Sequence, residues 1–301
     1  MSAVPNVKPL DYFSREEWAR LTAHIPFMGL LLVLHCWAMI IAATAIFIVW
    51  PNPLTYVLAV MIIGARQLGL AILMHDASHG LLSKNKKLND FLGHYATGIF
   101  IGAPLRLYRN YHLKHHKFAQ QQEDPDLVLS SPFPVTKASL RRKIIRDLTG
   151  QTFLKLRVLP IFKRNLDANF NFGDLQFLGA NIVLFAIAAA AGSWWAYFAL
   201  WLVPLATWHM LVTRLRNIAE HACLTNNPDP WGVARTTLAN PLERLLIAPY
   251  WVHYHSEHHL FMYVPCYRLR RVHNALRKKG LTNKLVVARG YLPVLNEAAS
   301  A

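Results

Sequence analysis

The chain has 301 residues, of which 54% are hydrophobic and only 16% are charged. With a mean hydropathy of +0.22, this is the composition of a membrane protein. A net charge of +16 would suit nucleic acid, but in so apolar a chain it favours anionic lipid headgroups and an acidic protein partner. We therefore expect no nucleic acid partner. Three cysteines, Cys36, Cys223 and Cys266, do not make a disulfide framework.

Two pairs of apolar stretches predict four transmembrane helices. Residues 27–50 carry no formal charge and are long enough to cross a bilayer, and residues 54–74 follow a tight turn at Pro51-Asn52-Pro53. Residues 175–191 and 194–213 form the second pair. The apolar stretch 91–105 is too short to span and is predicted to be interfacial or re-entrant. The expected fold is an all-α integral membrane protein with two transmembrane hairpins under a cytoplasmic helical cap.

The basic residues predict the orientation of these hairpins. Of the 32 lysines and arginines, 16 lie in residues 75–174 and 12 in residues 214–301, and neither hairpin turn contains one. By the positive-inside rule, both segments and both termini are expected in the cytoplasm. The expected parts are a cytoplasmic tail (1–26), a first hairpin (27–74), a cytoplasmic segment (75–174), a second hairpin (175–213) and a cytoplasmic segment (214–301).

Histidines recur in three short motifs, here called the first, second and third histidine boxes: HDASH (75–79), HLKHH (112–116) and HSEHH (255–259). Histidines at i, i+3 and i+4 share one face of a helix, and two HxxHH motifs in one chain are rare by chance. Because imidazole is the commonest neutral metal ligand, the boxes predict a polyhistidine metal site. The eight candidates are His75, His79, His112, His115, His116, His255, His258 and His259.

Helix lengths place the first box beside a further pair of polar residues. A helix over residues 54–79 would be about 39 Å long, and one over 194–221 about 42 Å, whereas the hydrocarbon core takes about 30 Å. Both helices would therefore project from the membrane on the same side. The first would carry His75 and His79 there, and the second would carry Asn217 and His221 on one face.

The three boxes, in this order and around two apolar hairpins, resemble the membrane fatty acid desaturase family, whose superfamily includes membrane hydroxylases and carotenoid ketolases. The resemblance implies two bound iron ions (Fe2+/Fe3+). It also implies a ninth ligand, a histidine four residues after an asparagine, which His221 and Asn217 match. An asparagine amide is a poor iron ligand, so Asn217 is expected to act through a metal-bound water. No other side chain is expected to be catalytic.

The activity implied by this resemblance is O2-dependent insertion of a double bond into a fatty acyl lipid. No flavin, haem or iron–sulfur motif is visible, so the electrons are expected from an external donor of the ferredoxin or cytochrome b5 type. A hydroxylase or carotenoid ketolase would use the same ligands and stays an alternative. A transporter would place polar residues along a mid-membrane path, so histidines near the helix ends argue against one.

Several polar residues near the boxes have predicted supporting roles. At least two of the nearby carboxylates are expected to hydrogen-bond the outer ring nitrogens of ligands. Arg66 and Gln67, in mid-span, are expected to make interhelical contacts. The five carboxylates considered are Asp76, Asp124, Asp126, Glu220 and Glu257. The histidines expected in packing, interfacial or surface positions are His24, His35, His94, His209, His253 and His273.

Overall fold

The computed structural model describes residues 3–166, 171–225 and 228–301, and most of this chain is helical. Two short strands in the described ranges, β1 (Arg235–Thr237) and β2 (Val286–Ala288), pair in parallel. The helices are η1 (Pro9–Asp11), α1 (Arg15–Thr22), α2 (Met28–Val49), α3 (Pro53–Ser78), α4 (Lys86–Tyr95), η2 (Gly98–Ile101), α5 (Leu105–Phe118), α6 (Leu127–Ser130), α7 (Lys137–Leu148), α8 (Gln151–Phe153), η3 (Leu154–Val158), α9 (Leu159–Leu166), α10 (Phe172–Ala190), α11 (Trp194–Tyr197), η4 (Phe198–Leu202), α12 (Val203–Ala206), α13 (Trp208–His221), α14 (Pro241–Leu246), α15 (His255–Leu260), α16 (Cys266–Lys278), η5 (Thr282–Lys284) and α17 (Tyr291–Ala298).

Four helical stretches in the described ranges are long and apolar enough to cross a membrane, as the sequence predicted. They are Met28–Val49, Pro53–Ser78, Phe172–Ala190 and Trp194–His221. Large apolar side chains on α2 and α10, such as Ile41 and Ile182, are more than 60% exposed. Exposure of such apolar surfaces to water is unfavourable, whereas contact with lipid chains is not. The predicted stretch 91–105 is not a span, and it forms the end of α4, η2 and the start of α5.

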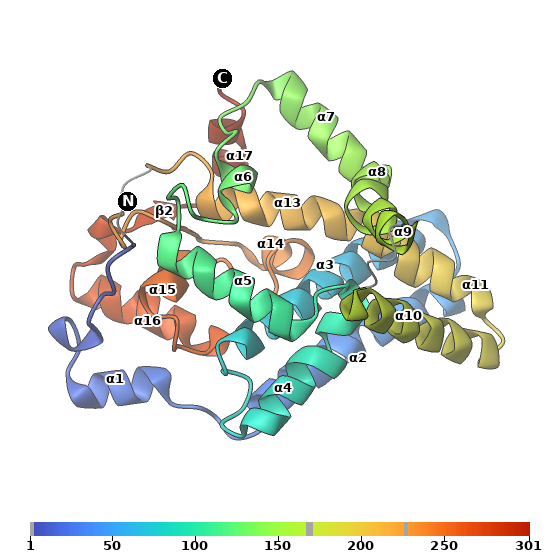
Figure 1. The fold of residues 1–301 in the computed structure, drawn as a ribbon, viewed down its shortest axis with the longest axis horizontal. Coiled ribbons are helices and arrows are strands. Elements are labelled where there is room, and N and C mark those ends of the chain that lie inside the picture. The colour runs from blue at the N-terminus through green and yellow to red at the C-terminus, as the bar shows by residue number, and fades with distance from the viewer. Residues whose placement is uncertain (1–2, 167–170, 226–227) are drawn as a thin grey trace.

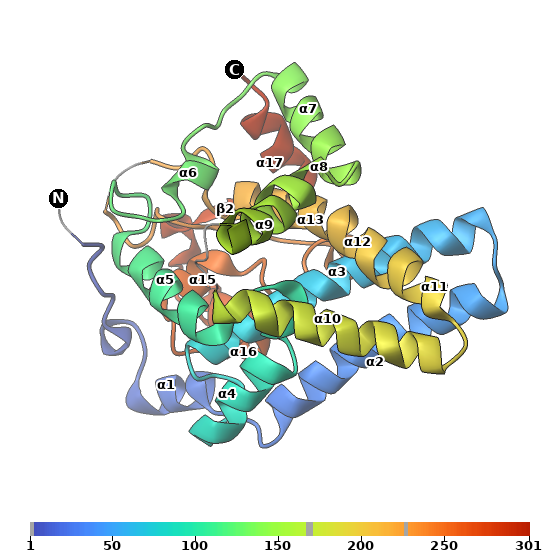
Figure 2. The same ribbon diagram turned by 45° about the vertical axis from the view of Figure 1, so that its right-hand side comes forward.

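A tight turn joins α2 to α3, and the two helices lie side by side (Figures 1 and 2). The side chain of Asn52 accepts hydrogen bonds from the N–H groups of Leu54 and Thr55, while Pro53 occupies the first helical position. Both features are typical of a helix N-terminus, since they satisfy or remove N–H groups that lack helical partners.

The centre of the fold is α3, which is buried over most of its second half. Gln67 donates a hydrogen bond to the carbonyl of Trp201 (2.9 Å), and Arg66 donates one to the carbonyl of Leu245 (2.7 Å). These contacts confirm the interhelical role expected for both residues. They fix the middle of α3 against the rest of the molecule.

The stretch Trp194–His221 is not the uniform helix that its length suggested. Its residues pass through α11, the π-helical turn η4 and α12 before α13 begins, and Thr207 at the junction has the non-helical angles φ −120° and ψ −85°. Pro204 explains the irregularity, because a proline within a helix removes a backbone hydrogen bond and clashes with the preceding turn. The stretch still ends at His221.

The elements that carry the histidine boxes gather at one end of the molecule. In both views α2, α3, α10 and α11 extend together to the right, whereas α5, α15 and α16 lie to the left (Figures 1 and 2). The last turns of α3 and α13 reach this left-hand group. The helix ends and the two HxxHH boxes therefore meet, as their lengths predicted.

A close approach between α4 and α3 supports the first box and can be tested. A Cβ added at Gly93 would lie 2.2 Å from the Cβ of Ala77, which stands between His75 and His79. We expect Gly93→Ala to destabilise the protein by about 1–3 kcal/mol, because a rigid backbone segment must move. Gly179→Ala is the control, since a Cβ there meets nothing within 4 Å. Thermal unfolding in detergent would measure both, and an unchanged midpoint for Gly93→Ala would contradict this packing.

Candidate metal centre

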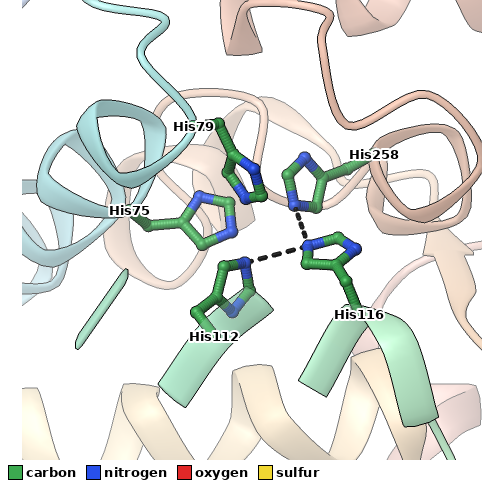
Figure 3. A group of neighbouring side chains, drawn as sticks. All are labelled: His75, His79, His112, His116 and His258. Atoms are coloured by element: carbon green, nitrogen blue, oxygen red, sulfur yellow. Dashed lines mark hydrogen bonds between the residues drawn. The ribbon is translucent and has the colours of Figure 1, made fainter. Parts of the chain in front are cut away.

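All nine histidines selected from the sequence come together, and they form two adjacent groups. Potential ligand atoms within each group lie within 4.8 Å of one another. Figure 3 shows the first group, whose rings point toward a common centre. The first group contains His75, His79, His112, His116 and His258. The second contains His115, His221, His255 and His259.

The division between the groups follows helical spacing. On α5, His112 and His116 at i and i+4 enter the first group, while His115 at i+3 enters the second. On α15 the first and last histidines of the box enter the second group, and His258 enters the first. Residues four apart point in nearly the same direction along a helix, whereas the residue at i+3 is turned from them. Each of these two helices therefore contributes histidines to both groups.

Ring nitrogens of the first group have the spacing that a shared metal ion requires. Nε2 of His116 lies 2.9 Å from Nε2 of His112 and 3.0 Å from Nε2 of His258 (Figure 3). Two nitrogens bound at right angles to one metal at about 2.1 Å would be about 3.0 Å apart. The buried Nε2 atoms of His75 and His79 have no hydrogen-bond partner among the described residues. This donor set fits a metal ion.

The second group shows the same spacing. Nε2 of His255 lies 2.9 Å from Nε2 of His221 and 3.1 Å from Nε2 of His259, which in turn is 3.3 Å from Nε2 of His115. The ring of His259 stacks on that of His116 from the first group, with centroids 4.3 Å apart. The two groups therefore fit a pair of neighbouring metal ions.

Burial keeps these imidazoles in the form that binds metal. Loss of solvation lowers the pKa of six box histidines outside the candidate spans, and the neighbouring imidazoles lower it further. Such groups remain neutral near pH 7, so their lone pairs stay available to a cation. The histidines with lowered pKa are His79, His112, His116, His255, His258 and His259.

The first box is held by Arg109, which no sequence motif indicated. Arg109 donates hydrogen bonds to the carbonyls of Ser78 and Ala77, both at 3.0 Å, and to the carboxylate of Asp90 at 2.6 Å. These carbonyls lie at the C-terminal end of α3, where helical partners are missing and a cation is favoured. Because Arg109 belongs to α5, it fixes the first box against the second.

The carboxylate of Asp124 orients the second box. Nδ1 of His115 lies 2.8 Å from Asp124, which also accepts the N–H groups of Gln120 (2.9 Å) and Asp126 (2.8 Å). A carboxylate at Nδ1 favours a proton there and leaves the Nε2 lone pair for the metal. Asp124 therefore has the supporting role expected of it. Asp126 is farther from the same nitrogen, at 3.7 Å.

The first box also contacts α16 through Asp76. Its carboxylate accepts the N–H of Cys266 at 2.9 Å and lies 3.6 Å from Nδ1 of His75. The backbone contact is a good hydrogen bond, whereas the distance to the imidazole is too long for one. Asp76 therefore positions the end of α3 more than it orients the ring.

The third box is fixed by a network around Glu257. This buried carboxylate accepts hydrogen bonds from Thr236 (2.5 Å) and from Nδ1 of His273 (2.7 Å), while Ser256 donates to the carbonyl of Ala234 (2.9 Å). Glu257 was a candidate partner for a box imidazole, but its hydrogen bonds go to β1 and α16 instead. His273 thus supports the box from outside it, which periodicity alone could not show.

The end of α13 brings Asn217 and His221 to the second group. Nδ1 of His221 bonds the carbonyl of Val233 (3.0 Å), which fixes the ring and leaves Nε2 facing its neighbours. Glu220 accepts a hydrogen bond from Arg216 (2.6 Å), and its other oxygen lies 3.4 Å from Nε2 of His255. This carboxylate therefore adds negative charge close to the second group.

A small cavity adjoins the second group. It has a volume of about 130 Å³, and Asn217 lines it together with His115, His221 and His255. Its size admits a few waters or a diatomic molecule. The position of Asn217 beside these rings is the one expected from the spacing of Asn217 and His221.

The remaining histidines lie outside both groups. Four have hydrogen-bond partners elsewhere: His35 with Tyr250 (3.0 Å), His94 with Gln176 (2.9 Å), His253 with the carbonyl of Thr237 (3.0 Å) and His273 with Glu257 (2.7 Å). His24 is half-buried, and His209 is buried within α13. The separation of box from non-box histidines agrees with the expectation from sequence.

Comparison with known proteins identifies the family of this chain. The relatives include dihydrorhizobitoxine desaturase of Bradyrhizobium elkanii, which is 27% identical over 285 residues that cover 86% of this chain and 78% of that protein. Beta-carotene ketolase of Paracoccus sp. (strain PC1) is 26% identical, with 79% and 88% covered. The sn-1 acyl-lipid omega-3 desaturase (ferredoxin) of Nostoc sp. (strain 36) is 25% identical, with 69% and 63% covered. The fatty acid desaturase family model matches residues 51–289, and the chain belongs to this family of oxidoreductases.

Proposed function

We propose that the protein is an integral membrane di-iron enzyme that introduces a double bond into the acyl chain of a lipid. The observation that carries this proposal is the pair of histidine groups, one of five residues and one of four, whose ring nitrogens have metal-ligand spacing. Imidazole alone does not distinguish iron from zinc, copper or nickel. Iron is favoured by membership of the desaturase family.

In this proposal the two irons supply O2-dependent oxidation of a C–H bond. Desaturation removes two hydrogen atoms from adjacent carbons and reduces O2 to two waters with two external electrons and two protons. The chain's own residues hold the metals, and Asp124 and the carbonyl of Val233 keep two of the rings oriented. Rigid orientation matters because the carbons that lie beside the metals determine where the double bond forms.

Asn217 is proposed to hold a water that is a ligand of the second metal. It lines the cavity next to three ring ligands, and its amide can donate and accept hydrogen bonds. A held water leaves that coordination position exchangeable, whereas a tenth imidazole would close it.

The proposed setting is a multi-pass membrane protein with its metal centre on the cytoplasmic side. The positions of the lysines and arginines support this orientation, because they concentrate outside the apolar helices. The same basic surface suits an acidic external electron donor, and a ferredoxin is favoured over cytochrome b5 because it is named for the Nostoc relative. The substrates are then a fatty acyl lipid and O2.

A second candidate reaction is insertion of oxygen, as in a hydroxylase or carotenoid ketolase. The similarity to the Paracoccus ketolase, which is as high as that to the acyl-lipid desaturase, supports it. The same ligand set would serve both reactions, and the substrate geometry would decide between them.

Product analysis distinguishes these reactions. We expect lipids of cells that express the protein with a ferredoxin and its reductase to gain acyl chains lighter by two hydrogens. A ketolase or hydroxylase would give products that contain an additional oxygen, which high-resolution mass spectrometry would identify. A His116→Ala variant provides the background. Oxygenated products without new double bonds would refute the desaturase proposal and support the second candidate.

Metal content tests the two groups separately. We expect His116→Ala to reduce bound iron from about two ions per chain to about one, and His255→Ala to do the same through the other group. The double variant should retain almost none. His24→Ala is the control because His24 belongs to neither group. Iron measured by plasma emission on the purified proteins would decide, and full iron in either single variant would refute the assignment.

Asn217 requires a different pattern from the histidines. We expect Asn217→Ala to keep most of its iron but to lose at least tenfold in desaturation rate, because the ring ligands survive and the water site does not. His221→Ala should lose iron as well as activity. Both variants would be compared for iron content and product formation. Unchanged desaturation by Asn217→Ala would place Asn217 in the scaffold.

A further inference from the structure

A larger cavity lies next to the metal centre and has no role in holding the metals. Its volume is about 510 Å³, and it lies among α3, α5 and α13. It adjoins the small cavity at the second group, since both are lined by Tyr108, Tyr111 and Arg216. Tyr108 also stacks on His112, with ring centroids 5.2 Å apart. A molecule in the larger cavity would therefore be one side chain away from the metal centre.

One part of this cavity is apolar. Leu68, Ala71, Met74 and Ile101 contribute to its wall, and Leu68 is only 1% exposed. Such a surface favours a hydrocarbon segment, because removing apolar area from water is favourable.

Another part of the wall carries polar atoms that the fold leaves unsatisfied. His209 is 3% exposed, and its Nδ1 has no hydrogen-bond partner among the described residues. The same is true of Oγ1 of Thr213. Buried polar atoms are almost always hydrogen-bonded, and an unpaired one lowers stability. Two such atoms on one cavity wall point to a polar ligand group.

The charges around the cavity favour an anion. Among its described lining residues are two arginines, Arg157 and Arg216, and no carboxylate. Arg157 donates one hydrogen bond to the carbonyl of Gly102 (2.9 Å), and Arg216 donates one to Glu220 (2.6 Å). Asp174, whose charge acts on Arg157, lines a neighbouring cavity. A guanidinium has five N–H donors, so one such bond leaves donors for a ligand oxygen.

The polar residues form a line toward the metals. His209, Thr213 and Arg216 recur at i, i+4 and i+7, so they share one side of α13. At a rise of 1.5 Å per residue, His221 lies about 12 Å beyond Thr213 and about 18 Å beyond His209 along the helix axis. An anchored polar group would thus set the distance from itself to the carbon at the metal centre.

We propose that this cavity binds the substrate as an amphipathic anion. The anionic oxygens would be bound by Arg157 and Thr213, and the hydrocarbon chain would run past Tyr108 to the metals. The anion is either the carboxylate of a free fatty acid or the phosphate of a phospholipid. This inference rests on the proposed function and deepens it, because the distance along α13 from the anion site to the metals would then determine which carbons react.

Binding to the purified protein in the absence of an electron donor tests the cavity without relying on activity. The probes are two matched pairs, decanoic acid with methyl decanoate and dioctanoyl phosphatidate with dioctanoylglycerol, measured by equilibrium dialysis in a maltoside detergent. We expect wild type to prefer one of the two anions over its neutral partner by about tenfold. The preferred pair identifies the source of the anion. Equal binding within both pairs would overturn the proposal.

Variants then assign the preference to this cavity. Arg157→Gln and Thr213→Val should each remove most of it, while Thr213→Val should unfold at no lower temperature because its hydroxyl has no partner to lose. The controls are Lys155→Gln, an exposed neighbour of Arg157, and Thr207→Val, whose hydroxyl bonds the carbonyl of Val203 (2.6 Å). A preference that survives in both test variants would overturn the proposal.

The iron-loaded protein separates this inference from the proposed function. An anion preference that depends on Arg157 and Thr213, in a protein that forms no oxidised lipid, would support the cavity and refute the desaturase. Desaturation of neutral and anionic probes at the same rate would support the desaturase and overturn the cavity proposal.

Discussion

The structure depends on one constraint: nine imidazoles, seven of them buried, must be held with ring nitrogens directed at two points. A buried polar atom without a partner is costly, and here several ring nitrogens have only one another. In the proposed holoprotein the metal ions provide the missing partner, so metal binding also stabilises the fold. The same burial that makes the apoprotein unfavourable lowers the pKa of six of these rings and keeps their lone pairs ready to coordinate.

Each box is held in place by a different set of hydrogen bonds. An arginine from the second box's helix caps the carbonyls that end α3, a carboxylate in the following loop orients His115, and β1 holds α15 through Thr236 and Glu257. These supports come from separate parts of the chain, and each contacts a histidine box or its immediate neighbour. The candidate metal centre therefore lies where several helices end or begin. Hydrogen bonds to backbone carbonyls and carboxylates hold these helices together as much as packing does.

Much of this could be predicted from sequence because its signals are local. Apolar stretches of sufficient length identified the four candidate spans, the spacing within the three boxes identified eight of the nine histidines, and the resemblance to the desaturase family added His221. The assignment of His258 to the first group could not be predicted, because it depends on how α15 is rotated against α3 and α5. The same holds for Arg109 and His273, whose partners are distant in sequence.

The sharing of α5 and α15 between the two groups has a consequence for biosynthesis. When the ribosome has made the first hairpin and the second box, the nascent chain carries four of the five histidines of the first group but only His115 of the second. Neither ligand set is complete until α15 emerges, after both apolar hairpins. In the proposed di-iron protein, iron loading would therefore have to await the synthesis of α15, so a chain that stalls or misinserts before that point would present no complete ligand set.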